Sequence, residues 1–198
     1  MSGPSRFYRG AYRIANPVFR VFYRIKIVGR ENINQGAAVI CVSHSSMLDP
    51  IFLGMALSIK HQPHIIAKAE IYKNPFLAWL VGKLGAIKVD RNKPDINTIK
   101  ESLGYLRNGA KVAIFPEGTR VADDASGAAK HGAVKIAERA GAPILPVYLP
   151  RKKRVFGRVR IVIGKSYEIP KQAGKRTHED YDKLSDELMD RILELKEQ

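Results

Sequence analysis

Two short polar clusters in this sequence carry side chains whose types and spacing could do chemistry. The first, residues 43–50, contains His44 and Asp49. A carboxylate that accepts a hydrogen bond from one imidazole nitrogen fixes the tautomer and leaves the other nitrogen free to take a proton. The pair is therefore a candidate general base for a hydroxyl group, provided that a turn brings the two side chains together. The simpler alternative is that Asp49 caps a helix beginning at Pro50 and that His44 is an ordinary loop residue.

The second cluster, residues 115–120, contains Glu117, Gly118, Thr119 and Arg120. Glycine allows the backbone to approach a ligand closely, threonine offers a hydroxyl group, and arginine can hold a phosphate through two hydrogen bonds. This combination favours an anion site, and the carboxylate of Glu117 would suit a ligand that also carries hydroxyl groups. The alternative is a turn at the end of a strand with a surface salt bridge.

Both clusters follow apolar runs that the pattern predicts to be strands. Short β-branched runs indicate buried strands at residues 37–42, 64–68, 86–89, 111–115, 144–149 and 159–163. Helical patterns lie between them at 50–59, 75–84, 96–107 and 133–140, and a last amphipathic helix begins at Thr177. This alternation predicts an α/β domain with a largely parallel mixed sheet flanked by helices. Both polar clusters then lie at the carboxyl ends of strands, where such folds place their sites.

The composition is that of a globular protein with a large excess of positive charge. Of 198 residues, 45% are hydrophobic and 27% are charged, which excludes a fibrous or wholly disordered chain. The net charge of +15 indicates an anionic partner: a nucleic acid, an anionic membrane or a phosphorylated substrate. The single cysteine, Cys41, cannot form an internal disulfide and favours a reducing compartment. The sequence contains no nucleotide-binding glycine loop, HExxH or GxSxG motif, and its five histidines have no metal-ligand spacing.

The first 30 residues carry seven basic residues and no acidic one. On a helix over residues 6–25, the arginines gather on one face and an apolar face lies on the other. We expect the Asn16-Pro17 pair to divide this segment into two short amphipathic helices. Such helices are typical of a membrane surface, and the predicted membrane contacts are Arg6, Arg9, Arg13, Arg20, Arg24, Phe7 and Phe22. The alternative is a helix packed on its own domain with a solvated basic face.

The chain therefore divides into a membrane-association arm, residues 1–30, and one domain, residues 31–198. No uncharged apolar run reaches the roughly 18–20 residues that span a bilayer, so the arm is expected to attach peripherally. Basic residues interrupt the first 30 positions and leave no apolar core for a secretory signal.

Together the two clusters resemble the glycerolipid acyltransferases, in particular the 1-acylglycerol-3-phosphate acyltransferases. The resemblance rests on His-x4-Asp at residues 44–49, followed about seventy residues later by Phe-Pro-Glu-Gly-Thr-Arg at residues 115–120. Residues 68–70, 85–87 and 89–91 are similar to the family's second block, which ends in a phosphate-binding arginine, and residues 143–147 to its fourth. The resemblance covers roughly residues 36–150. Two positions depart from the family pattern: Ser43, where asparagine is common, and Val121, where serine is usual.

The resemblance implies a glycerolipid acyltransferase fold and transfer of a fatty acyl group from a thioester to the sn-2 hydroxyl of 1-acylglycerol 3-phosphate (lysophosphatidic acid). His44 would be the general base, and Asp49 would orient it. The implied substrate contacts are Arg91 and Arg120 on the phosphate, Gly118 and Thr119 beside it, Glu117 on the glycerol portion, and Lys68 at the oxyanion or the thioester. The acyl donor would be acyl-carrier protein or coenzyme A carrying the acyl group, and neither a cofactor nor a metal would be needed.

The implied location is the cytoplasmic face of the cell membrane, with the enzyme attached peripherally to the anionic surface. Three alternatives stay open at this point. The acceptor could be glycerol 3-phosphate or another lysolipid, since the motifs do not decide it. The charge and the basic turn at residues 151–154 also fit a nucleic-acid binder, but no nucleic-acid recognition motif is present and no such partner is expected. A membrane-surface protein without activity is disfavoured because His44, Asp49, Glu117 and Arg120 occur together.

Overall fold

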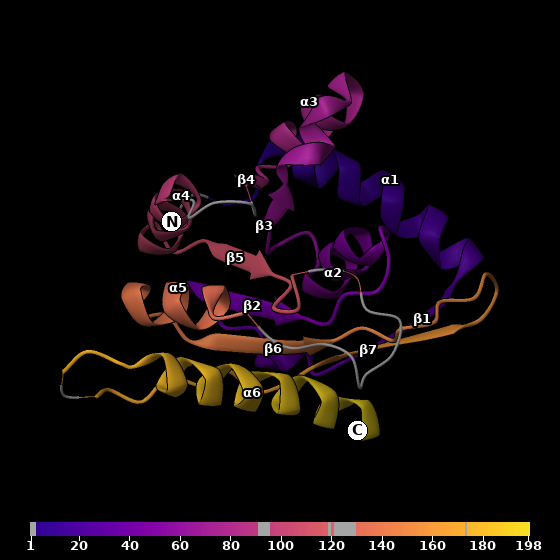
Figure 1. The fold of residues 1–198 in the computed structure, drawn as a ribbon. Helices are drawn as coiled ribbons and strands as arrows, with labels where there is room; N and C mark the ends of the chain where they lie inside the picture. The colour runs from indigo at the N-terminus through magenta and orange to yellow at the C-terminus, as the bar shows by residue number, and fades with distance from the viewer. Residues whose placement is uncertain (1–2, 91–95, 119, 121–129, 173) are drawn as a thin grey trace.

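The computed structural model describes residues 3–90, 96–118, 120, 130–172 and 174–198. A seven-stranded sheet forms its centre, in the order β1-β7-β6-β2-β5-β3-β4. Neighbouring strands are parallel apart from β6 and β7, which are antiparallel. The predicted α/β class with a largely parallel mixed sheet is thus confirmed (Figure 1). The strands are β1 Arg24–Val28, β2 Ala38–Val42, β3 Pro63–Lys68, β4 Ile87–Val89, β5 Lys111–Ile114, β6 Ile144–Tyr148 and β7 Arg158–Ile163.

Helices cover both faces of the sheet (Figure 1). On one face lie α1 (Arg6–Phe22) and α2 (Asp49–Leu57), and on the other lie α4 (Ile96–Arg107), α5 (Gly132–Ala140) and α6 (His178–Glu194). The remaining helix, α3 (Pro75–Lys83), lies next to α1 at the top of the view. Short 3₁₀ turns occupy Arg30–Asn32, Ala69–Lys73 and Leu195–Glu197.

The alternation of side chains along the strands divides the core in two. Val39 and Cys41 of β2 pack with the helices α5 and α6, whereas Ile40 and Val42 pack with α2. All residues of β2 are buried, as expected for a strand that is covered on both faces. A shift of one residue would exchange the two faces, so this packing fixes where β2 ends and therefore where His44 begins the next loop.

The helix α1 is continuous, so the predicted division into a helix pair is wrong. Ser5 caps it, since the Ser5 hydroxyl accepts a hydrogen bond from the Tyr8 amide at 3.1 Å, and the helix then runs through Pro17. Proline removes one backbone donor at this position, yet the helix continues for five residues beyond it to Phe22. Phe19, two residues after Pro17, lies edge-on against Phe52 of α2 with ring centroids 5.5 Å apart.

The sheet begins inside the segment that the sequence assigned to the arm. Strand β1 pairs with β7 from Arg24 to Val28, so these residues belong to the domain and the arm consists of α1 with the residues before it. Arg24 therefore lies on an edge strand and not on the helix, although its side chain is exposed. Within the described residues, we find no helix that is both long and apolar enough to cross a membrane.

Candidate active site

His44 lies on the loop that leaves the carboxyl end of β2 and enters α2 at Asp49. The turn brings the two side chains together, with His44 Nδ1 2.9 Å from Asp49 Oδ2. The His44 ring also stacks on Phe115, which follows β5, with ring centroids 4.1 Å apart. In the part of the chain that the structure describes, Nε2 has no hydrogen-bond partner, and the side chain is 15% exposed. One ring nitrogen is thus held while the other can receive a proton.

Asp49 is fully buried and holds both the imidazole and the loop. Its Oδ2 accepts hydrogen bonds from the amides of Ser45 at 2.7 Å and Ser46 at 2.8 Å, and Lys153 Nζ lies 2.6 Å from Oδ1. Burial alone would raise the pKa of Asp49, but the bonds from His44 and Lys153 outweigh it and hold the pKa below its usual value. An ionised Asp49 can only accept, so Nδ1 of His44 carries the proton and Nε2 is the basic nitrogen.

Glu117 is buried behind the same loop. Its Oε2 accepts a hydrogen bond from the His44 amide at 2.8 Å, and its Oε1 accepts one from Arg151 Nη2 at 2.6 Å. Burial raises the pKa of Glu117 above its usual value, although Arg151 and the His44 amide oppose the rise. Because both oxygens are bonded to protein and the side chain is inaccessible, Glu117 is placed to position His44 rather than to bind glycerol, the role that the resemblance implied.

Sequence reasoning placed Arg151 and Lys153 only in a basic turn and missed their place in the site. Arg151 bonds Glu117 and also donates from Nη1 to the His44 carbonyl at 3.0 Å, while Lys153 contacts Asp49. The two basic side chains are only 7% and 3% exposed. A signal was available, because both residues closely follow a predicted strand. That strand, β6, pairs with β2, so the basic turn emerges at the same edge of the sheet as His44.

Ser43 ties the end of β2 to the end of β6. Its hydroxyl donates a hydrogen bond to the Leu149 carbonyl at 3.0 Å and accepts one from the Leu149 amide at 2.9 Å. The Ser45 hydroxyl adds a third link, donating to the Arg151 carbonyl at 2.9 Å. Serine at position 43 therefore serves the neighbouring backbone, which explains how a small hydroxyl side chain is accommodated there.

Comparison with known proteins identifies the family to which this chain belongs. A family model described as "Acyltransferase" matches residues 24–150, which contain both polar clusters. The 1-acyl-sn-glycerol-3-phosphate acyltransferase of Bacillus subtilis is 32% identical over 177 residues, which cover 86% of this chain and 87% of the relative. The chain belongs to the acyltransferase family. The resemblance that the two clusters carried is thereby confirmed.

Two further matches extend this acyltransferase assignment. The 1-acyl-sn-glycerol-3-phosphate acyltransferase of Pseudomonas aeruginosa is 32% identical over 152 residues, which cover 71% of this chain and 58% of the relative. Among solved structures, the 1-acyl-sn-glycerophosphate (LPA) acyltransferase PlsC of Thermotoga maritima superimposes with a TM-score of 0.71 and 25% identity. That match covers 96% of this chain and 80% of the other. The overall fold is therefore shared over nearly the whole of this chain.

Three of the other contacts predicted for the acyltransferase site are described by the structure, and they lie at or beyond the last residues of strands that end at the same edge of the sheet. Gly118 is buried with a φ of +71°, a left-handed conformation that favours glycine. Arg120 is exposed two residues further on. Lys68 ends β3, which is two strands away from β2. Two predicted contacts lie outside the described residues: Arg91 and Thr119.

A cavity of about 270 Å³ opens beside this centre. Phe115, Pro116 and Gly118 line it together with mainly apolar residues of α4, α5 and the ends of β3 and β4. Phe115 is the link between the cavity and the base, since its ring stacks on His44. The lining suits an aliphatic chain that ends near the imidazole.

One cluster of described residues could hold a metal ion. His131, at the start of α5, and His178 and Asp182 of α6 place ligand atoms within 4.8 Å of one another. Asp182 already joins both rings, with Oδ1 2.6 Å from His131 Nε2 and Oδ2 3.1 Å from His178 Nδ1. The cluster is separate from the His44 loop, and the reaction considered below does not use it.

An exposed apolar surface runs along α1 and α3. Every residue of α3 is at least partly exposed although the helix is apolar, and Trp79 of α3 meets Phe7 of α1 edge-on at 5.5 Å. We define the α1–α3 surface by its most exposed large apolar residues: Ile14, Val18, Val21, Phe22, Phe76 and Trp79. Arg6, Arg9, Arg13 and Arg20 are exposed beside it. The second apolar helix next to α1 is therefore α3, which the sequence assigned only to the body of the domain.

Proposed function

We propose that this acyltransferase transfers a fatty acyl group from a thioester to the sn-2 hydroxyl of 1-acylglycerol 3-phosphate, giving phosphatidic acid. The observation that carries the proposal is the His44–Asp49 pair, with a buried carboxylate on Nδ1 and an open Nε2 at the carboxyl edge of the sheet. The acceptor follows from the relatives in Bacillus, Pseudomonas and Thermotoga, whose names specify this substrate.

The chemistry is direct transfer. Nε2 of His44 takes the proton of the acceptor hydroxyl as its oxygen attacks the thioester carbonyl carbon. The tetrahedral intermediate then collapses, the carbon–sulfur bond breaks, and the proton passes from His44 to the departing sulfur. Asp49 stabilises the transient imidazolium. No acyl-enzyme intermediate is required, which agrees with Cys41 being fully buried in β2, where burial raises the pKa of its thiol.

The remaining predicted contacts are proposed to bind the two substrates. Arg120 and Arg91 would hold the phosphate of the acceptor, and Gly118 and Thr119 would offer the backbone and hydroxyl beside it. Lys68 would stabilise the oxyanion or the thioester. The cavity against Phe115 would take a fatty chain.

Replacing Arg120 with alanine is expected to raise KM for 1-acylglycerol 3-phosphate with little change in kcat, because a contact made in both ground and transition states acts on binding. Hydrogen bonds to charged groups contribute about 1.5–3 kcal/mol, so KM should rise about tenfold or more. The preference over an uncharged monoacylglycerol should shrink by the same factor. Arg107→Ala, at the exposed end of α4, is the matched control. An unchanged preference in Arg120→Ala would place the phosphate elsewhere.

The acyl donor is proposed to be acyl-carrier protein or coenzyme A carrying the acyl group. Both are anionic, which suits the net charge of +15. The function is tested by incubating the purified chain with either donor and with labelled 1-acylglycerol 3-phosphate or glycerol 3-phosphate, and identifying the product by mass spectrometry. Acylation of glycerol 3-phosphate alone would replace the proposed acceptor, and no transfer to either would overturn the activity.

We infer that the α1–α3 surface rests on the anionic cytoplasmic face of the cell membrane. Its apolar side chains are 44–71% exposed, and exposed arginines on the adjoining face of α1 suit lipid phosphates. Phe156, in the loop between β6 and β7, is 65% exposed and adjoins Phe22, so the surface continues past the end of α1. The attachment is peripheral on this proposal.

Replacing Ile14 and Val21 together with serine is expected to reduce flotation with anionic vesicles, because both side chains are about 70% exposed and burying them in lipid is favourable. Circular dichroism should be unchanged. Ile96→Ser on α4, also 64% exposed, is the matched control. Deleting the whole arm is less informative, because Tyr8 is buried and its hydroxyl donates to the Ser58 carbonyl. Full flotation of the double variant would show that another surface makes the contact.

A further inference from the structure

A charged cavity among the described residues lies at the edge of the sheet opposite His44. It has a volume of about 470 Å³ and is bounded by the start of α1 and the amino ends of β3, β4 and β5. Strand β5 makes the separation plain: Lys111 at its first position lines this cavity, whereas Glu117 beyond its last position belongs to the His44 site. The cavity is therefore not part of the catalytic centre.

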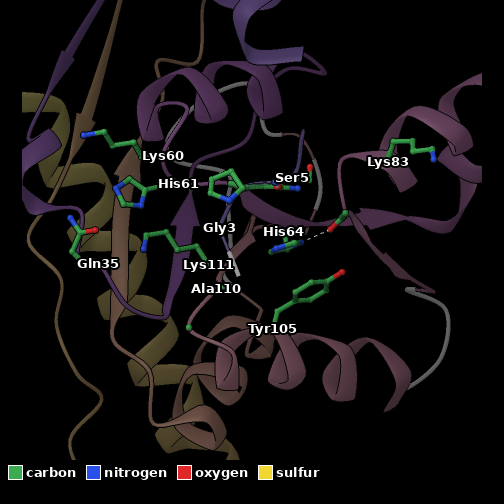
Figure 2. Close-up of a pocket in the computed structure, with 14 residues that line it drawn as sticks. Gly3, Ser5, Gln35, Lys60, His61, His64, Lys83, Tyr105, Ala110 and Lys111 are labelled. Atoms are coloured by element: carbon green, nitrogen blue, oxygen red, sulfur yellow. Dashed lines mark hydrogen bonds between the residues drawn. The ribbon is translucent and has the colours of Figure 1, made fainter. Parts of the chain in front are cut away.

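The lining of this cavity carries positive charge without a carboxylate. Three lysines and two histidines line it, and none of its lining residues is aspartate or glutamate. Figure 2 shows Gln35, Lys60, His61 and Lys111 on one side of the cavity, with His64 and Tyr105 toward the other and Lys83 further away on α3. His64 is already committed, since its Nδ1 bonds to the Gly85 carbonyl at 2.9 Å. The side with two lysines and His61 is thus the one free to bind a ligand.

Lys111 places a buried ammonium group at this cavity, whose lining contains no carboxylate. It is 3% exposed, and within the described residues its ammonium group has one hydrogen-bond partner, the Gly36 carbonyl at 2.8 Å. Burial lowers the pKa of Lys111 to about 8, since no paired carboxylate offsets the loss of water. Lys60, His61 and Lys111 line the same cavity, and burial, followed by the charges of Lys111 and Lys60, lowers the pKa of His61. A buried ammonium group without a counter-ion would be stabilised by a bound anion.

We propose that this cavity binds a phosphate group through Lys60, His61 and Lys111. A phosphate dianion would neutralise the two lysines and accept hydrogen bonds from their compact ammonium groups. The volume lies in the range of small-molecule sites, so a phosphorylated metabolite of up to nucleotide size fits. The proposal is independent of the acyl-transfer reaction.

The phosphate can come from two sources. One is a free phosphorylated molecule. The other is a lipid headgroup, because the cavity touches both helices of the α1–α3 surface. The Ser5 amide at the start of α1 bonds to Gln62 Oε1 at 2.7 Å, and Gln62 Nε2 bonds to the Leu84 carbonyl just after α3 at 2.8 Å. A phosphate bound here would lie beside this link between the two helices.

The test is calorimetric titration of the full chain with inorganic diphosphate at fixed ionic strength. Lys60→Gln and Lys111→Met should each weaken binding about tenfold or more, since each removes a charged donor. Lys183→Gln, on the exposed face of α6, should bind as the parent does. Lys60 is exposed, so its variant tests the site even if the buried Lys111→Met does not fold. No binding by the parent, or equal binding by Lys60→Gln and Lys183→Gln, overturns the proposal.

Imidazole nitrogen resonances localise the ligand. Diphosphate should shift the signals of His61 and leave those of His178 in place, whether or not it also enters the proposed acceptor-phosphate site beside His44. Shifts at His44 alone would put the anion in the catalytic site and overturn the proposal. Flotation with phosphatidic acid vesicles separates the two sources. A headgroup source predicts weaker flotation of Lys60→Gln than of Lys183→Gln, whereas a free phosphate source predicts equal flotation with diphosphate binding still impaired.

Discussion

Replacing His44 with alanine is expected to lower kcat/KM by at least about 100-fold, because general-base catalysis contributes about 10²–10⁴-fold. The fold should survive the change. Asp49 keeps Lys153 and the amides of Ser45 and Ser46 when the imidazole is gone, so no buried carboxylate is left unpaired. Steady-state rates with 1-acylglycerol 3-phosphate, together with thermal unfolding of the same samples, measure both effects.

Two matched variants sharpen this test. His44→Asn keeps an N–H that can reach Asp49 but has no basic nitrogen, so it should be as inactive as the alanine variant while remaining closer to the parent in stability. His178→Ala removes a histidine that is 80% exposed on α6 and should leave the rate unchanged. A rate above about a tenth of the parent's in His44→Asn would remove His44 from the role of general base.

The central part of the fold could be predicted from local pattern. Continuous apolar runs gave β2, β5 and β6, because strands buried on both faces need such runs. Strand β1 was missed because Arg24 and Ile25 also continue the amphipathic period of α1. The alternation of basic and apolar residues from Arg24 to Ile27 was the competing signal. Only pairing with β7, more than a hundred residues away, decides between the two periods.

The orientation of α1 could not be read from its periodicity. The pattern identifies a basic face and an apolar face, but it does not say which face the domain covers. The structure buries the aromatic edge between them: Tyr8 is 7% exposed and Tyr23 lies edge-on against Phe52. The apolar stripe that includes Ile14 is left exposed. Rings with polar tips fit this contact because the Tyr8 hydroxyl can bond to backbone carbonyls of α2 and the turn that follows.

The site shows the same division between local and long-range information. Chemistry and spacing were sufficient to pick His44 and Asp49, which the turn into α2 brings into contact. The partners of the basic turn at residues 151–154 could not be predicted in this way, because a run of like charges normally indicates a solvated surface. Arg151 and Lys153 are instead buried by the neighbouring strand ends, where Glu117 and Asp49 neutralise them. Such pairing depends on strand order and not on sequence distance.

Replacing Glu117 with alanine is expected to reduce both stability and turnover. The buried Arg151–Glu117 ion pair would be lost, and removing one partner of a buried ion pair typically costs about 3–5 kcal/mol. In a chain of 198 residues this corresponds to a fall in melting temperature on the order of 10 °C. The His44 amide would also lose its acceptor, so the loop that carries the base would be held less firmly. Calorimetry and steady-state kinetics on one preparation measure the two effects.

The double variant Glu117→Leu with Arg151→Met separates positioning from stability. It replaces both members of the buried ion pair, so it should regain most of the stability that Glu117→Ala loses, since apolar replacements of buried ion pairs are often neutral or stabilising. Its kcat should stay low, because leucine cannot accept from the His44 amide and methionine cannot donate to the His44 carbonyl. KM for the acceptor should change less than kcat, since both side chains are buried and bonded to the loop that carries His44. If kcat recovered in step with stability, Glu117 and Arg151 would serve the fold alone and not the placement of the base.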